Sequence, residues 1–169
     1  MTKLSEYQGK LAMVTGAGDG IGEMLAKQLA AAGLTVAVQD IRQDAAARVV
    51  SEIRGTAFPI VFDVSDRDAC LAAADALRAH GPLNLLWINA GVGVGSPILT
   101  GKPNAIEWAL GVNVYGVIWT AQAFTPLMQT AEGPRHVGFT ASTAALQSPA
   151  SAFPLYATTK HATFAFADA

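Results

Sequence analysis

Two side chains near the end of the sequence have the types and the spacing of an acid/base pair. Tyr156 and Lys160 are four residues apart, so on a helix they lie on the same face. A free tyrosine has a pKa of about 10 and is a poor base at neutral pH. A neighbouring ammonium, with the cation of a bound cofactor, favours the phenolate and makes a general acid/base. The spacing alone is frequent by chance in surface pairs, but its position after a serine-bearing strand end favours catalysis. Lys160 can also hold ribose hydroxyls.

Two further polar residues precede this pair. Ser142 lies 14 residues before Tyr156, directly after a predicted strand, where its hydroxyl can donate to a substrate carbonyl oxygen. Thr143 is the adjacent alternative, and a serine in an ordinary strand-to-loop turn is another. Asn113 stands between two glycines, which are poor helix formers, so we expect an irregular helical turn there. A freed carbonyl at Asn113 would hold a water that passes protons toward Lys160.

A glycine-rich segment near the N-terminus has the composition of a phosphate-binding loop. An apolar run at 11–14 is followed by TGAGDGIG at 15–22, and apolar residues at helical spacing continue to position 29. A strand, a glycine-rich turn and a helix form half of a mononucleotide-binding unit, in which backbone N–H groups approach a pyrophosphate closely. The predicted cofactor contacts here are Gly16, Gly18, Asp19, Gly20, Ile21 and Gly22. A tight turn without a ligand is the alternative.

An acid follows at the end of the second predicted strand. Asp40 lies 18 positions after Gly22, near the spacing at which a carboxylate meets an adenosine ribose. Such a carboxylate accepts both ribose hydroxyls and repels a 2′-phosphate, and Asp19 adds a second negative charge. The positive charge of Arg42 favours NADP, but the nearer acid, Asp40, predicts NAD as the cofactor and makes NADP less favoured. A strand-end turn acid is the other interpretation of Asp40.

The ends of the third and fourth predicted strands carry the remaining cofactor contacts. Asp63 is predicted to receive the adenine amino group while Val64 lies against the ring, although a helix cap would also explain Asp63. Asn89, Ala90 and Gly91 follow the fourth strand. We expect Asn89 to steady the sheet around the site, and Gly91 to let the backbone pass close to the cofactor.

The elements that must position these residues alternate between strands and helices. Strands are expected at 11–14, 34–38, 57–62, 83–88 and 136–140, and helices at 21–29, 44–54, 67–79, 104–129 and from 155. This alternation predicts an α/β fold of the Rossmann type, a doubly wound parallel sheet of strand order 3-2-1-4-5 in a three-layer α/β/α arrangement. Ligands bind beyond the carboxyl ends of such strands. We see no linker or repeat, so 1–169 is predicted to be one domain.

Composition excludes several classes of function. The net charge of −2 gives no electrostatic footprint for nucleic acid, and one cysteine cannot form an internal disulfide. Neither a signal peptide nor an apolar run of membrane-spanning length is present, which predicts a cytoplasmic protein without a membrane partner. No histidine has a ligand-spaced partner, so no metal site is expected. Charged residues make up 14%, against roughly 25% in an average domain, which suggests that much surface is covered.

The ordered motifs resemble those of the short-chain dehydrogenase/reductase family, in its branch of single-domain alcohol and ketone oxidoreductases. The motifs are Thr15-Gly16-x-x-x-Gly20-Ile21-Gly22, Asp63-Val64, Asn89-Ala90-Gly91, Asn113, Ser142 and Tyr156-x-x-x-Lys160. The resemblance covers the chain from about Gly9 onward and implies a tetrad. In it Asn113 relays protons, Ser142 binds the carbonyl, Tyr156 is the acid/base and Lys160 activates it. Ile88 stands where the family often has a second asparagine.

The resemblance also implies more chain than is printed here. Family members normally continue beyond the position of Ala169 with two more strands, further helices and a lid over the substrate. A fragment of a longer protein, or a truncated form without activity, is therefore expected. We also expect a homodimer or homotetramer, in which the helix from Asn104 and the helix of Tyr156 pack across a two-fold axis.

The predicted function is an NAD(H)-dependent oxidoreductase that interconverts a secondary alcohol and a ketone by hydride transfer. The alternatives are a truncated nucleotide-binding protein without catalysis, or an epimerase or dehydratase with a tightly held cofactor. A methyltransferase also uses a glycine loop but has no use for Tyr156 and Lys160. The substrate loops at 92–97 and 143–153 are apolar, which argues against a phosphorylated substrate. Their apolar members are Val94, Leu146, Pro149 and Phe153.

Overall fold

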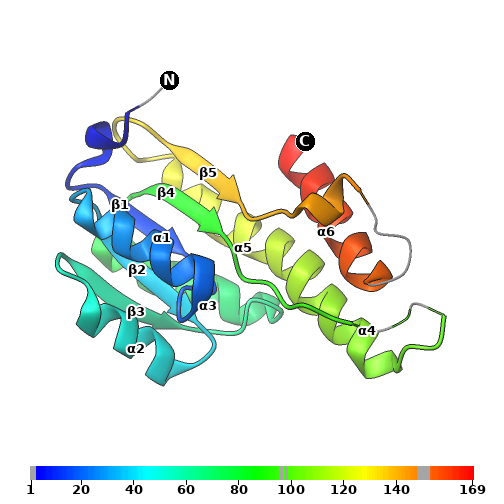
Figure 1. Ribbon diagram of the computed structural model, residues 1–169. Coiled ribbons are helices and arrows are strands. Elements are labelled where there is room, and N and C mark those ends of the chain that lie inside the picture. The colour runs from blue at the N-terminus through cyan, green and yellow to red at the C-terminus, as the bar shows by residue number, and fades with distance from the viewer. Residues whose placement is uncertain (1–2, 96, 98, 148–152) are drawn as a thin grey trace.

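A parallel sheet forms the centre of the computed structural model, which describes residues 3–95, 97, 99–147 and 153–169 (Figure 1). Within these residues the sheet has five strands in the order β3-β2-β1-β4-β5, all paired in parallel. The strands are β1 (Leu11–Val14), β2 (Thr35–Asp40), β3 (Ala57–Val61), β4 (Leu83–Ile88) and β5 (His136–Phe139). The predicted fold class and strand order are both confirmed.

Helices cover both faces of the sheet and make three layers (Figure 1). They are α1 (Gly20–Ala31), α2 (Gln43–Glu52), α3 (Arg67–Leu77), α4 (Pro103–Leu110), α5 (Gly116–Phe124) and α6 (Pro154–Asp168). Because successive strand residues point to opposite faces, Ala12 and Val14 pack with α1 and α2, whereas Met13 packs with α3 and α5. The buried Cys70 of α3 belongs to the second of these cores.

The long helical segment predicted at 104–129 is present as Pro103–Met128, but changes of backbone geometry divide it into four consecutive parts. After α4 the chain forms a π-turn (Gly111–Tyr115), in which the N–H of Gly116 donates to the carbonyl of Gly111. α5 follows and ends in a 3-10 turn (Thr125–Met128) that contains Pro126, which has no N–H to continue an α-helix. The irregular turn expected around Asn113 is therefore present.

Helix ends explain the other differences from the expected boundaries. The carboxylate of Asp66 accepts hydrogen bonds from the N–H groups of Asp68 and Ala69, at 2.9 and 3.0 Å, and so caps α3. α2 ends at Glu52, two residues earlier than predicted, because Ile53 takes an extended backbone conformation. None of the helices in the described residues is long and apolar enough to cross a membrane.

α6 stands apart from the two layers of helices. It lies beyond the carboxyl end of β5 and beside the segment that runs from α4 to α5 (Figure 1). It packs on the π-turn, on α4 and on a short 3-10 turn (Thr143–Ala145). This position brings the first turns of α6 to the edge of the sheet where all five strands end.

Candidate active site

A cleft of about 860 Å³ opens at the carboxyl ends of the strands. The predicted site residues that line it are Gly16, Asp19, Gly20, Ile21, Asp40, Asp63, Val64, Asn89, Ala90, Gly91, Ser142, Tyr156 and Lys160. Gly18, Gly22 and Asn113 lie behind its surface. The cleft also includes residues that were not predicted as contacts, among them Gln39, Trp108 and Val112. Residues from helices, from a strand and from the loops after the strands thus meet at one edge of the sheet.

The start of α1 approaches the end of β1 too closely for any side chain at position 22. A Cβ on Gly22 would lie 2.2 Å from the carbonyl oxygen of Gly16 and 2.5 Å from Nδ2 of Asn89. The helix N-terminus is therefore held against the strand ends, where its N–H groups and partial positive charge face the cleft. Gly22 shapes the site without lining it.

Asp40 is fixed at the end of β2 through both carboxylate oxygens. Oδ2 accepts a hydrogen bond from the N–H of Gly18 at 3.0 Å, and Oδ1 accepts one from the N–H of Arg42 at 2.9 Å. A Cβ on Gly18 would lie 2.5 Å from Oδ2, so only glycine allows this contact. Asp40 is 7% exposed, yet it lines the cleft. The spacing in the sequence predicted that Asp40 lies at the site, but its hydrogen bond to the glycine loop was not predicted.

Arg42 lies at the same end of the cleft as the two acids. Its Nε is 3.5 Å from Oδ1 of Asp40, and its Nη2 is 3.9 Å from Oδ2 of Asp19. The side chains of Arg42 and Asp19 are both more than half exposed, so the longer pair is screened by water. Two carboxylates, of Asp19 and Asp40, and one guanidinium therefore lie at this end of the cleft.

Asp63 and Val64 line the cleft directly after β3. Oδ1 of Asp63 accepts from both the N–H and the hydroxyl of Ser65, at 2.8 and 2.7 Å, which forms a local turn. The alternative interpretation of Asp63 as a helix cap is wrong, because Asp66 caps α3.

Asn89 ties three strand ends together. Its Nδ2 donates to the carbonyl oxygens of Thr15 and Gly16, at 3.0 and 3.2 Å, and its Oδ1 accepts from the hydroxyl of Thr140 at 2.9 Å. These partners belong to the ends of β1 and β5, on either side of β4. The arrangement agrees with the expected role of Asn89 as support for the site.

Thr15 and Gln39 also support the cleft, and the sequence argument missed both. The hydroxyl of Thr15 accepts from the N–H groups of Asn89 and Ala90, at 2.9 and 3.0 Å. The amide of Gln39 accepts from the N–H of Gly16 at 3.0 Å and donates to the carbonyl of Phe62 at 2.6 Å. Both side chains are buried, at 0% and 1% exposure. A polar residue in or just after an apolar strand is the signal that could have identified them.

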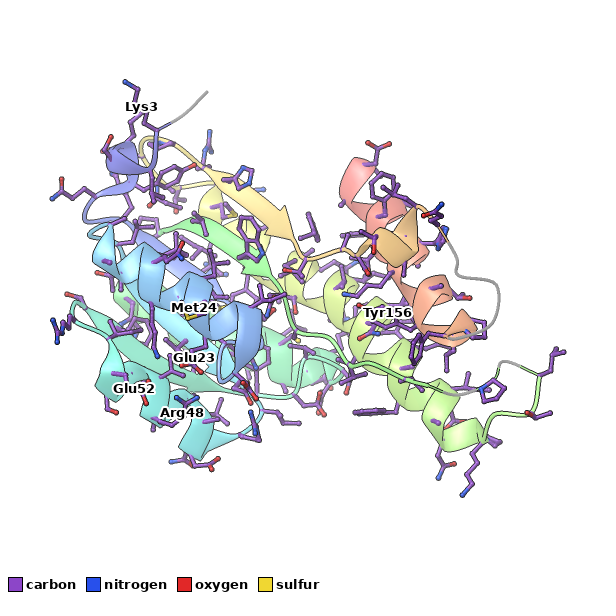
Figure 2. The ribbon with its side chains drawn as sticks, viewed as in Figure 1. Lys3, Glu23, Met24, Arg48, Glu52 and Tyr156 are labelled. Atoms are coloured by element: carbon purple, nitrogen blue, oxygen red, sulfur yellow. The ribbon has the colours of Figure 1, made fainter. Side chains whose placement is uncertain are left out.

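Tyr156 and Lys160 face the cleft from the first two turns of α6. Figure 2 shows Tyr156 on the side of α6 that faces the segment after β4. The ammonium of Lys160 lies 5.8 Å from the centre of the Tyr156 ring, as expected from the four-residue spacing. It donates to the carbonyl oxygen of Thr140 at 2.8 Å. Lys160 is 5% exposed, and this burial lowers the pKa of its ammonium.

The hydroxyl of Ser142 lines the cleft and also starts the 3-10 turn after β5. Its oxygen accepts from the N–H of Ala144 at 3.2 Å, which leaves the hydroxyl proton to donate elsewhere. Thr143, the alternative to Ser142, is not among the cleft residues. The hydroxyl of Thr140 is occupied by Trp87 and Asn89, whereas its carbonyl orients Lys160.

Asn113 joins α6 to the loop after β4 instead of lining the cleft. Its side chain, 1% exposed, accepts from the N–H of Val92 at 2.7 Å and donates to the hydroxyl of Thr159 at 3.0 Å. The backbone carbonyl expected to be free accepts from the hydroxyl of Thr163 at 3.0 Å, so that expectation is corrected. α6 packs on the π-turn and brings Thr163 within reach. Neither threonine was predicted, although Thr159 and Thr163 lie three and seven residues after Tyr156 and therefore on the same side of one helix.

The loops expected to line a substrate pocket are only partly described. Val94 is buried at 7% exposure, whereas Leu146 and Phe153 are 73% and 50% exposed, and Pro149 lies outside the described residues. From the first loop, Val92 and Gly93 reach the cleft. In the part of the chain that the structure describes, no three His, Cys, Asp or Glu side chains are grouped to hold a metal.

Comparison with known families decides what kind of protein carries this cleft. The family model described as short chain dehydrogenase matches residues 10–169. The chain belongs to the short-chain dehydrogenase family. The matched range includes all five strands of the sheet and every residue that lines the cleft.

The chain is similar to several named short-chain dehydrogenases. It is 34% identical to the C alpha-dehydrogenase of a Sphingobium species over 157 residues, which are 89% of this chain and 51% of that relative. The structure of a short-chain dehydrogenase/reductase from Burkholderia phymatum in complex with NAD is 36% identical with a TM-score of 0.91, covering 96% of this chain and 59% of that one. A 7 alpha-hydroxysteroid dehydrogenase complexed with NADH and 7-oxo glycochenodeoxycholic acid is 32% identical with a TM-score of 0.87, covering 98% of this chain and 66% of that one. The chain spans about half the length of curated relatives such as this C alpha-dehydrogenase.

Proposed function

We propose that this short-chain dehydrogenase is an NAD(H)-dependent oxidoreductase that interconverts a secondary alcohol and a ketone. One observation carries the proposal: Ser142, Tyr156 and Lys160 line the same cleft as the glycine loop and Asp40. A protein that only held a nucleotide would need the loop and the acid but not a phenol beside a buried ammonium. The structure of the Burkholderia relative, solved in complex with NAD, supports the same cofactor.

The residues of the cleft fit a dinucleotide. Asp40 offers a carboxylate at the ribose end, and the close approach at Gly22 leaves the N–H groups of the α1 N-terminus facing the diphosphate. Val64 and Asp63 would flank the adenine, and Lys160 would hold hydroxyls of the second ribose. The bound nicotinamide would supply or accept the hydride.

The chain's own side chains would handle the proton. The Tyr156 hydroxyl would give its proton to the ketone oxygen, or take one from the alcohol, while the Ser142 hydroxyl donates to the same oxygen. Lys160 would stabilise the phenolate from its position beside the ring. Asn113 would act from behind this group, since its side chain orients Thr159 and the loop at Val92. Its backbone carbonyl accepts from the hydroxyl of Thr163 and so helps to hold α6.

Tyr156→Phe tests this proposal, because it removes the acid/base hydroxyl and keeps the ring. We expect turnover with a panel of secondary alcohols, followed by the absorbance of reduced cofactor, to fall by about a hundredfold or more. The dissociation constant for NAD, measured by titration calorimetry, should change little. Unchanged turnover in the variant would refute the assigned role. A parent protein that binds NAD yet turns over no alcohol would favour the non-catalytic nucleotide-binding protein, and NAD that copurifies without net turnover would favour an epimerase or dehydratase.

We further propose that the protein is a homo-oligomer joined along the α4–α5 segment and α6. Large apolar side chains are exposed there, including Tyr115 at 51% and Phe164 at 44%. Tyr115 stacks on Trp119, with ring centres 6.0 Å apart, which makes a flat aromatic surface. An exposed apolar surface of this kind is typical of a contact between subunits. Light scattering should give the mass of a dimer or tetramer, and Tyr115→Glu should shift it toward the monomer; a monomeric parent protein would contradict the proposal.

A further inference from the structure

Arg48, on α2, reaches across to the glycine loop. Its Nη2 donates to the carbonyl oxygen of Gly18 at 3.0 Å, and also to Oε2 of Glu23 at 2.7 Å. Its Nη1 contacts Oε1 of Glu23 at 3.3 Å, so the guanidinium binds the carboxylate through two nitrogens and two oxygens. Figure 2 shows Glu23, Arg48 and Glu52 together where α1 and α2 lie side by side. Arg48 itself is not a cleft residue.

The bond to Gly18 fixes the orientation of a peptide group in the loop. The structure has no cis peptide bond among its described residues, and in a trans peptide the C=O and the following N–H point in opposite directions. With the Gly18 carbonyl held toward α2, the N–H of Asp19 is turned to the other side of the loop. Asp19 lines the cleft, and the N–H of Gly18 is already held by Asp40. Both peptide groups around Gly18 are therefore anchored, one by β2 and one by α2.

Arg48 also balances a charge at the end of α1. Glu23 lies in the first turn of that helix, whose N-terminus would face the cofactor diphosphate. A lone carboxylate in that turn would repel an anion. Its hydrogen bonds with Arg48, and then with Lys27, lower the pKa of Glu23 to about 2, so the carboxylate is charged but paired. The pairing leaves the helix N-terminus free to attract an anion.

We propose that Arg48 is a positioning residue for the diphosphate of the dinucleotide, acting through the Gly18 carbonyl and the Glu23 carboxylate. This inference rests on the proposed function, since it requires a dinucleotide in the cleft. It predicts that Arg48 affects ligands that carry a diphosphate and leaves ligands without one unaffected. The proposed adenine contacts follow β3, and the proposed ribose contact, Asp40, binds the N–H of Gly18, which belongs to the peptide group that Arg48 does not contact.

Two ligands separate this role from a general structural one. ADP-ribose carries the diphosphate, whereas adenosine has the same base and ribose without it. For Arg48→Gln, titration of the two ligands should show a dissociation constant for ADP-ribose that is raised about tenfold, with adenosine within about twofold of the parent value. Arg48→Lys keeps the charge but loses the fork, and its ADP-ribose affinity should lie between those of Arg48→Gln and the parent. In steady-state turnover, the KM for NAD should rise while kcat stays within about twofold.

Two control variants use the same stretch of chain. Arg54→Gln removes an exposed arginine two residues after α2, which makes no hydrogen bond to Gly18 or Glu23. Glu52→Gln removes an acid that contacts Arg48 at 3.1 Å but leaves the bond to Gly18 in place. Both should bind ADP-ribose like the parent.

The outcomes distinguish this inference from the proposal on which it rests. If Arg48→Gln binds ADP-ribose as well as Arg54→Gln does, Arg48 has no positioning role and the proposed function stands. If it loses adenosine and ADP-ribose to the same extent, the role is general to the fold and the inference is overturned. A parent protein that binds neither NAD nor ADP-ribose overturns both.

Discussion

Individual polar residues at the strand ends of this protein each bind two or more partners. Asp40 is the most telling case, because one carboxylate oxygen anchors the loop at Gly18 and the other the backbone at Arg42. Gln39 and Asn89 likewise link neighbouring strand ends. Hydrogen bonds on two sides orient each of these side chains, which suits groups that must meet a ligand without rearrangement.

Asp40 should decide the choice between the two nicotinamide cofactors. If the adenosine ribose binds at Asp40 as proposed, a 2′-phosphate would lie against this carboxylate, so we expect kcat/KM for NAD to exceed that for NADP by about a hundredfold. Asp40→Asn keeps the shape and removes the charge, so the preference for NAD should fall. The check is paired steady-state kinetics with both cofactors.

Asp44→Asn is the matched control, because Asp44 is an exposed acid in the first turn of α2 that lies outside the cleft. Asp44→Asn should keep the parent protein's preference for NAD over NADP. A preference for NADP in the parent protein would contradict the cofactor assignment. Arg42 would then be the residue to substitute next.

At the level of elements, the side of the cleft that carries Tyr156 and Lys160 depends on how α6 packs on the π-turn. Asn113 donates to Thr159, and the hydroxyl of Thr163 donates to the carbonyls of Asn113 and Thr159, at 3.0 and 3.1 Å. Both threonines are buried. The extra residue of a π-turn widens the helix and exposes a carbonyl that α6 then engages. This contact fixes the helix that carries Tyr156 and Lys160.

Thr163→Val should therefore loosen α6. Valine keeps the volume but leaves the buried carbonyl of Asn113 without this donor, so the free energy of unfolding should fall by about 1–2 kcal/mol. Urea unfolding followed by circular dichroism measures the change. Thr158→Val serves as the control, since Thr158 is exposed on the same helix and its hydroxyl donates to the carbonyl of Pro154. Equal losses in the two variants would show that the contact with the π-turn contributes nothing particular.

Across the whole molecule, charge is scarce and four charged side chains are concentrated at one place. Glu23, Lys27, Arg48 and Glu52 form a network of ion pairs between α1 and α2. The side chain of Glu23 is the least exposed of the four, at 15%. Two of these ion pairs, Lys27–Glu52 and Arg48–Glu23, join α1 to α2.

The network makes stability depend on acidity in a definite direction. The pKa of Glu23 is lowered to about 2 in the folded protein by its hydrogen bonds with Arg48 and Lys27, whereas the unfolded value is about 4.3. The stabilisation is therefore complete above the unfolded pKa and is lost as the pH falls from there through about 2. Glu23→Gln should be less stable than the parent at pH 7, and the gap should close in acid. Urea unfolding at several pH values tests this.

The control for this experiment is Glu107→Gln, at an exposed position on α4. The free energy of unfolding of Glu107→Gln should match that of the parent protein at every pH. A gap for Glu23→Gln that stays constant into acid would mean that the network stabilises by packing and not by charge.

Local patterns in the sequence were sufficient for the framework of this protein. Apolar runs of strand length, the 3.6-residue period and the glycine loop fixed the alternation of strands and helices, from which the sheet order follows by the rules for parallel connections. The same patterns placed Asp40, Tyr156 and Lys160 at one edge of the sheet, since all carboxyl ends of parallel strands meet there.

Only the tertiary structure decided which groups hold these residues in place. Thr163 with Asn113, and Arg48 with Gly18, are separated by 50 and 30 positions and meet because helices pack on one another or on the sheet. Such contacts leave no periodic pattern in the sequence. Each partner, taken alone, cannot be distinguished from an ordinary helical or loop residue. The division of the predicted helix at 104–129 has the same origin, because the π-turn is held by groups from α6 and the loop after β4. Periodic local preferences determined the elements, and packing between distant segments determined the site.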